Sequence, residues 1–148
     1  MIITSKLNIT LYNKVVGFLT KKGKRNKAVN ILNSSFLKIN QLSKKPTFYV
    51  INKLFSVLNV YVETRTVRVR GGVHTIPFIL NLNRRIFLIV KWLISVVKKN
   101  SQKSPFFERF TKEISLILNK NSSSKVFRLK VLNENSAIKN RSNIHYRW

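Results

Sequence analysis

The residues of this sequence that could carry chemistry are almost all cations. The 148 residues include 29 Lys and Arg but only four acids, which gives a formal net charge of +25. The acids are Glu63, Glu108, Glu113 and Glu134. Carboxylates at such wide spacing do not form the pairs that acid–base catalysis or magnesium binding needs, and with no Cys a zinc site or thiol chemistry lacks its ligands. The sequence therefore predicts no enzyme, no catalytic residue, no metal site and no cofactor.

A charge this large and this unbalanced indicates a polyanionic partner, and nucleic acid is the usual one. The hydrophobic residues amount to 44% and the aromatic residues to 11%, which is ordinary core material and argues against a disordered basic tail. A length of 148 residues predicts one domain that spans the chain. We therefore expect a folded protein that binds nucleic acid.

The most informative cations lie in a predicted β-hairpin arm over residues 60–81. Two runs rich in β-branched residues flank Gly71-Gly72, and a type I′ turn needs positive φ at both central positions, so the two glycines are predicted to form the turn. Strand alternation places Arg68 and Arg70 on one face and Arg65 on the other. These arginines are predicted to bind RNA. The alternative is that they protect an edge strand from aggregation.

A second group of cations, Lys24, Arg25 and Lys27, follows Gly23 at the corner between two predicted helices over residues 9–22 and 26–42. This corner could present cations and free backbone N–H groups to an RNA phosphate. It could equally be a helix C-cap with solvated lysines.

A third group lies on a predicted helix over residues 83–100. Arg84, Lys91 and Lys98 recur at every seventh residue, so they form one stripe, which either binds RNA or is the solvated side of an amphipathic helix. The apolar stretch from Ile86 to Val97 is shorter than the roughly 20 residues of a membrane span, so we expect a core helix.

Hydrophobic spacing predicts three more helices, over residues 46–58, from about Pro105 to residue 118, and over residues 125–144. The predicted fold is mainly α, a single domain of about six helices with a protruding two-stranded β-hairpin arm. The segment 125–148 is predicted to be a basic C-terminal helix and tail.

Four segments, in order along the chain, resemble the bacterial and organellar small-subunit ribosomal protein S-seven family. Residues 23–28 resemble its Gly-Lys-Lys-Ser-x-Ala junction, and residues 62–77 resemble its basic strand, glycine turn and Val-Pro exit, closest to the plant-mitochondrial form. Arg84-Arg85 with residues 91–94 is similar to its Arg-Arg-x-x-x-Ala-x-Arg-Trp-Ile helix. Residues 140–148 resemble its closing Asn-Lys/Arg-x-Phe-Ala-His-Tyr-Arg-Trp, with Asn143 in place of Phe.

The resemblance implies a helical protein that binds the 3′ major domain of small-subunit rRNA and helps to nucleate assembly of the subunit head. It places the arm near the exit-site tRNA and the mRNA path, beside the ribosomal protein S-eleven neighbour. By position, the candidates for rRNA binding are Lys24, Arg25, Arg65, Arg68, Arg70, Arg84, Arg85, Lys91, Arg141, His145, Tyr146 and Arg147, with Lys27 and Lys98 added for their charge. Gly71 and Gly72 would shape the arm.

Three other interpretations compete with this one. A cationic membrane-surface protein would also have basic and apolar faces, but the several helices and the hairpin can bury each other's apolar faces, so no membrane partner is expected. A nucleoid-type DNA binder fits the charge equally well, and only the ordered resemblance discriminates against it. A nuclease lacks its carboxylates.

The excess of Lys, Asn, Ile and Phe is typical of an AT-rich coding genome. With no evident import signal at Met1 to Lys14, it predicts an organelle-encoded protein of the mitochondrion rather than the plastid.

Overall fold

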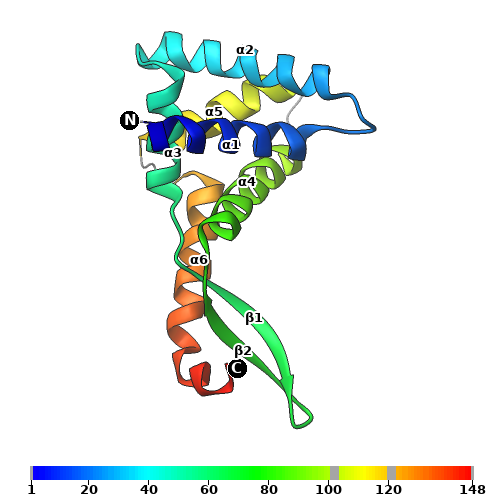
Figure 1. The fold of residues 1–148 in the computed structure, drawn as a ribbon, viewed down its shortest axis with the longest axis vertical. Helices are drawn as coiled ribbons and strands as arrows, with labels where there is room; N and C mark the ends of the chain where they lie inside the picture. Colours follow the sequence, from blue (N-terminus) through cyan, green and yellow to red (C-terminus); the bar gives the residue numbers. More distant parts are fainter. Residues whose placement is uncertain (1, 101–103, 120–122, 148) are drawn as a thin grey trace.

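A computed structural model describes residues 2–100, 104–119 and 123–147, and it consists of a helical body with a long extension (Figure 1). The body contains α1 (Ile2–Leu19), α2 (Arg25–Ser43), α3 (Thr47–Leu58), α4 (Leu82–Lys99) and α5 (Phe106–Leu118). The extension contains β1 (Val62–Val69), β2 (Gly72–Ile79), α6 (Lys125–Lys139) and the 3₁₀ helix η1 (Arg141–Tyr146). The predicted mainly helical fold with a two-stranded antiparallel hairpin is confirmed.

The core lies where the five helices of the body meet. Each contributes side chains that are almost fully buried: Leu11, Leu32, Ile39, Leu58, Ile89, Phe110, Ile114 and Ile117. The buried face of α4 lies in this core while Lys91 and Lys98 stay exposed, as the sequence pattern predicted; its core residues include Ile86, Ile89, Val90, Leu93, Val96 and Val97. Among the residues described, no helix combines the length with the hydropathy that a membrane crossing requires.

The first and last helices differ from the prediction. Helix α1 begins at Ile2 rather than near Ile9, because apolar residues at positions 3, 7 and 11 carry the helical period further upstream. Helix α6 ends at Lys139, and the chain continues as η1 rather than as α-helix to Ile144. Asn140 is the reason, because its amide donates to Ser136 O while its Oδ1 accepts from Thr75 in the hairpin.

The hairpin turn lies one residue earlier than predicted. The strands pair from Val62 with Ile79 to Val69 with Gly72, so the central turn residues are Arg70 and Gly71, with φ of 48° and 85°. Gly71 is a turn residue as expected, but Gly72 begins β2.

Pro77 accounts for this register. Hydrogen-bonded and non-hydrogen-bonded pairs alternate along an antiparallel ladder, and the pair that closes a two-residue turn is hydrogen-bonded. Counted from Val69 and Gly72, Pro77 falls opposite Thr64 in a non-hydrogen-bonded pair, where its missing N–H costs nothing. A turn centred on Gly71-Gly72 would have placed Pro77 in a hydrogen-bonded pair.

The protruding arm that the sequence predicted is not an isolated hairpin. Helix α6 lies along the hairpin, and η1 packs against β2, so that only the tip extends past the C-terminal segment (Figure 1). The extension is therefore a unit of three elements, hairpin, α6 and η1, and its contacts decide where the cations of the arm point.

Candidate nucleic-acid interface

A row of polar side chains fixes α6 against the hairpin. Asn133 Nδ2 donates to Val62 O at 2.6 Å, and Thr64 Oγ1 lies 3.2 Å from Ser136 Oγ. Further along, Thr75 Oγ1 donates to Asn140 Oδ1 at 2.6 Å. Residues 133, 136 and 140 share one helix face because they are three and four positions apart. This row gives the arm a fixed direction relative to α6.

The same row continues into η1 through Asn143, whose Nδ2 donates to Thr75 O at 3.0 Å. Asn143 stands where the resemblance expected Phe, so a hydrogen bond to the strand holds the C-terminal segment at this position.

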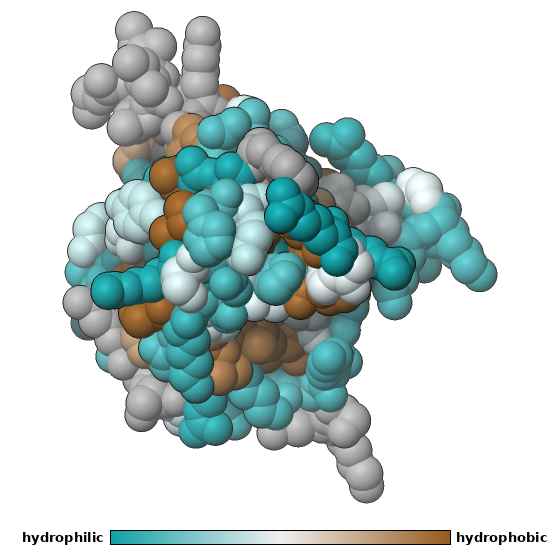
Figure 2. Space-filling model, turned by 90° about the horizontal axis from the view of Figure 1, so that it is seen from below, coloured by the Kyte–Doolittle hydropathy of each residue, from teal (hydrophilic) through white to brown (hydrophobic). Residues whose placement is uncertain are grey.

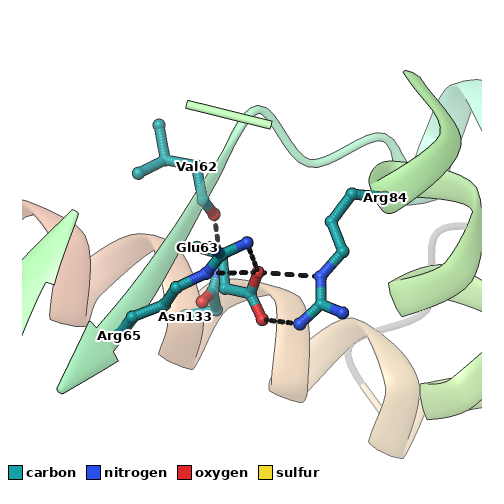
Figure 3. A network of polar contacts seen from close by, with 5 residues as sticks. All are labelled: Val62, Glu63, Arg65, Arg84 and Asn133. Carbon is teal, nitrogen blue, oxygen red and sulfur yellow. Dashed lines mark hydrogen bonds and ion pairs between the residues drawn. The ribbon is translucent and has the colours of Figure 1, made fainter. Parts of the chain in front are cut away.

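The base of the arm is joined to α4 by one carboxylate. Arg84 donates from Nη2 to Glu63 Oε1 at 2.7 Å and from Nε to Oε2 at 3.0 Å, while Arg65 donates to the same Oε2 at 3.2–3.3 Å (Figure 3). The hydrogen bond from Arg84 holds the pKa of Glu63 below its usual value against the opposing effect of burial, and Glu63 raises the pKa of Arg84. Two of the predicted RNA-binding arginines therefore share an internal partner.

Arg85 is held beside this carboxylate junction. Its Nε donates to Leu80 O at 2.9 Å, and its guanidinium lies 4.5 Å from the centre of the Tyr61 ring. Leu80 also belongs, with Val60 and Leu88, to a small apolar cluster separate from the main core. Arg84 and Arg85 thus fix the base of the arm.

A second carboxylate fixes the start of α6. Glu113 of α5 is buried and accepts from Ser124 Oγ at 2.7 Å and from Val126 N at 3.4 Å. Ser124 is also the N-cap of α6, since its Oγ accepts from Phe127 N. The negative charge of Glu113 sits at the positive end of the helix dipole. Glu63 and Glu113 therefore each join the body to the extension.

The tip of the extension combines free cations with stacked rings. Arg68 and Arg70 are exposed and take part in none of the ion pairs found among the described residues. Tyr146 stacks on His74 at 4.7 Å between ring centres and contacts His145 at 4.1 Å. Together with Arg70, these three rings line an open hollow of about 470 Å³. Seen along the long axis from this end, the molecule presents mostly hydrophilic side chains (Figure 2).

The other predicted residues do not all join this tip. Arg141, His145 and Arg147 are exposed on the C-terminal segment beside β2. Lys91 and Lys98 lie on the outer side of α4.

Lys24, Arg25 and Lys27 are exposed at the corner between α1 and α2, which lies in the body at a distance from the hairpin tip (Figure 1). Positive φ at Lys22 and Gly23 makes this corner, and no side chain caps α2 at Lys24. The predicted residues thus form a basic extension and a separate basic corner.

Sequence reasoning missed the residues that position the arm. For Asn133, Ser136 and Asn140 the sequence offered a signal, because three polar residues at helical spacing could face a threonine in each of the two predicted strands. No sequence signal indicated the stacking of Tyr146 on His74, since the two residues are far apart in sequence. Within the described residues, no group of three or more His, Cys, Asp or Glu could hold a metal ion.

A helical body with a braced, basic hairpin is an arrangement suited to a polyanion such as RNA. A family model described as ribosomal protein S7p/S5e matches residues 1–145. The small ribosomal subunit protein uS7m of Reclinomonas americana is 28% identical over 135 residues, which cover 91% of this chain and 83% of that protein. The chain belongs to the ribosomal protein S7p/S5e family.

Bacterial relatives are similar to a comparable degree. The small ribosomal subunit protein uS7 of Borrelia hermsii is 30% identical over 148 residues, covering 97% of this chain and 90% of that protein. Its counterpart in Desulfatibacillum aliphaticivorans is 26% identical over 144 residues, with the same coverage. The predicted resemblance to the S-seven family is confirmed.

Proposed function

We propose that this chain is built into the head of the small ribosomal subunit by binding the 3′ major domain of its rRNA, and that it helps to nucleate the head. The observation that carries the proposal is the contrast between the base of the arm and its tip. Arg65 and Arg84 are engaged by Glu63, whereas Arg68 and Arg70 project from the tip outside every described ion pair. Cations left unpaired on a rigid arm are suited to phosphates.

The proposal divides the predicted residues into two roles. Arg68, Arg70, Arg141 and Arg147 would contact phosphates, and the rings of His145 and Tyr146 would offer a surface for an unpaired base. Arg65, Arg84 and Arg85 would chiefly position the arm. The corner of Lys24, Arg25 and Lys27 and the α4 residues Lys91 and Lys98 would make further rRNA contacts away from the arm.

The position of the arm in translation is part of the same proposal. A braced hairpin can hold its tip at a fixed place, which supports the expected location near the exit-site tRNA and the mRNA path. The ribosomal protein S-eleven neighbour would lie beside it. We further place the protein in the mitochondrion, for which the Lys- and Asn-rich composition and the relative named uS7m are the support.

The test is a binding competition. The protein is mixed with labelled transcripts of the 3′ major domain and of the 5′ domain from the same rRNA, at equal length and at about 0.15 M salt, where non-specific phosphate binding is weakened. We expect at least about tenfold tighter binding to the 3′ transcript, within the range that separates specific from non-specific sites. Equal affinity for both transcripts, or for duplex DNA of the same length, would contradict the proposal.

Sedimentation gives the complementary measurement. Organelle lysate is separated on a sucrose gradient at high salt, and the chain is followed by immunoblotting. Migration with the small subunit is expected, because an integral protein survives salt that removes loosely bound cationic proteins. Recovery with membranes or with DNA would support one of the competing interpretations instead.

A further inference from the structure

A pocket of about 300 Å³ opens on the body, where the ends of α2 and α5 meet the start of α3. Its lining is mixed, with Ile39, Val50 and Leu118 as apolar residues and Ser43, Ser115 and Asn119 as uncharged polar ones. Leu42, Tyr49, Lys45 and Lys53 also line it. None of the residues predicted to bind RNA lies in this pocket, and the hairpin is at the other end of the molecule (Figure 1).

The pocket is formed by a well-defined corner of the chain. Lys44 adopts φ of 51° and ends α2, and the side chains of Asn40 and Thr47 are hydrogen-bonded across the corner at 2.6 Å. Ser43 Oγ donates back to Ile39 O at 2.8 Å. These contacts fix Lys45 and the first turn of α3 relative to α2, so a ligand would meet a preformed shape.

Around the pocket, apolar surface is exposed beside unpaired positive charge. Leu42 is 69% exposed and Tyr49 is 42% exposed, and the neighbouring Phe48 is also exposed. The ammonium of Lys45 lies 4.5 Å from the centre of the Tyr49 ring. Neither Lys45 nor Lys53 belongs to an ion pair in the part of the chain that is described. Exposed large apolar side chains that gather around a hollow mark an interaction site.

We propose that this pocket docks a segment of another protein of the small subunit, with one large apolar side chain in the pocket and flanking carboxylates on Lys45 and Lys53. The charges are complementary, since this corner has cations and the chain has almost no carboxylates of its own to offer. Burying Leu42 and Tyr49 under the segment removes apolar surface from water. The inference is independent of which RNA the arm binds.

The lining favours a peptide over RNA for two reasons. A peptide offers an apolar side chain to Ile39, Val50 and Leu118, and its backbone N–H and C=O groups suit the polar lining residues Ser43, Ser115 and Asn119. One face of the Tyr49 ring is occupied by Lys45, which removes a stacking surface.

The first test uses a defined probe. The fluorescein-labelled peptide acetyl-Glu-Glu-Leu-Phe-Glu-Glu-amide is compared by anisotropy with a peptide of equal charge in which Ser-Ser replaces Leu-Phe. We expect the Leu-Phe peptide to bind roughly tenfold or more tightly than the Ser-Ser peptide, the ratio that burial of one large apolar side chain gives. Equal affinity of the two peptides would mean that charge alone attracts them and would overturn the proposal.

Matched variants locate the binding. The double variant Lys45→Glu and Lys53→Glu should weaken binding of the Leu-Phe peptide by about tenfold. The control is the double variant Lys99→Glu and Lys112→Glu, which makes the same charge change on α4 and α5. It should change the affinity by less than about twofold. Leu42→Ser should abolish the preference for Leu-Phe, and Leu37→Ser, exposed elsewhere on α2, should retain it. Circular dichroism and binding to the 3′ rRNA transcript report separately whether each variant folds and keeps its RNA function.

The second test uses assembled subunits. A benzophenone amino acid placed at position 42 is irradiated in purified small subunits, and the products are treated with ribonuclease or with protease. A cross-link that survives ribonuclease supports a docked protein segment. This cross-link should be absent when the label is placed at position 37, and absent again when Lys45→Glu and Lys53→Glu are combined with the label at position 42. A cross-link that ribonuclease removes would assign the pocket to RNA and overturn the proposal.

Discussion

Arg84 and Glu63 meet at two points, with Arg84 Nη2 2.7 Å from Glu63 Oε1 and Arg84 Nε 3.0 Å from Oε2. Arg84 lies at the start of α4 and Glu63 lies in β1, so this ion pair connects the body to the base of the arm. The Glu63 side chain is only 14% exposed, and such a carboxylate needs its partner. An arginine that its spacing assigned to the RNA-facing stripe thus has a structural role.

Glu63→Gln should lower the free energy of unfolding by about 1–2 kcal/mol, because it removes a charged, two-point hydrogen bond from a partly buried site. The measurement is urea denaturation followed by circular dichroism, in about 0.2 M sodium sulfate to screen the net positive charge. Glu134→Gln is the control, since Glu134 is 45% exposed and its ion pair with Lys130 is long, at 3.9 Å. Its effect should stay below about 0.5 kcal/mol. Equal destabilisation of the two variants would show that the Glu63–Arg84 pair contributes no more to stability than an exposed ion pair.

Acid should weaken the same junction. Because Arg84 lowers the pKa of Glu63 in the folded protein below the ordinary value of 4.5, the unfolded chain binds the proton more readily. The stabilisation is therefore complete above pH 4.5 and is lost as the pH falls through the lowered pKa. The stability difference between the natural chain and Glu63→Gln should shrink over that range when urea midpoints are compared. A difference that stays constant with pH would contradict the assignment.

Arg68→Ala with Arg70→Ala should weaken binding to the 3′ rRNA transcript and flatten its salt dependence. For every phosphate that the arm no longer binds, the slope of log affinity against log salt should become shallower by roughly one unit. Lys99→Ala with Lys112→Ala removes the same charge from the body and should leave the slope nearly unchanged. If the slope of the arm variant matches the natural chain, the arm serves a different partner, such as tRNA or mRNA.

Ser124→Ala should destabilise the start of α6. It removes the N-cap hydrogen bond to Phe127 N and leaves the buried Glu113 with one donor fewer, at a combined cost of about 1–3 kcal/mol. Ser56→Ala is the matched control, since the exposed Ser56 hydroxyl only donates to a carbonyl of its own helix. Hydrogen exchange should show faster opening of α6 in the first variant alone. Unchanged protection of α6 would mean that the cap and Glu113 are not holding it.

The two glycines of the arm should respond differently to alanine. Gly71→Ala places a side chain at φ of 85° and should cost about 1–2 kcal/mol. Gly72 lies in β2 without positive φ, and its added Cβ would meet His74 Nε2 at 3.0 Å, which requires the stacked imidazole to shift by only a few tenths of an ångström. Gly72→Ala should therefore cost less, as judged by thermal unfolding. The reverse order would place the turn at Gly71-Gly72 after all.

Local patterns predicted the body well because its helices bury faces with a regular period. Helix α4 illustrates this, since its apolar residues between Ile86 and Val97 identify both the helix and its buried side. The start of α1 was missed although positions 3, 7 and 11 continue the period. The hairpin turn was misplaced by one residue, and the alternation of ladder bonds around Pro77 would have corrected it.

The roles of single cations in the site could not be predicted in the same way. Arg84 and Lys91 look alike in sequence, and only the fold brings Glu63, 21 residues earlier, against one of them. The end of α6 likewise depends on Thr75, which is 65 residues from Asn140. Contacts at such separations arise from the packing of whole elements, so spacing along the chain does not indicate them.

The row of bonds between the hairpin and α6 also sets an order of events during synthesis. The bonded residues are 65 to 72 positions apart, and a chain that grows at about 5–20 residues per second needs roughly 3–14 s to cover that interval. A hairpin closes in microseconds. The two strands of the arm therefore lack the cover of α6 for seconds after they are synthesised, and an RNA that engages their α6-facing side in that time must be displaced before the protein can take its final shape.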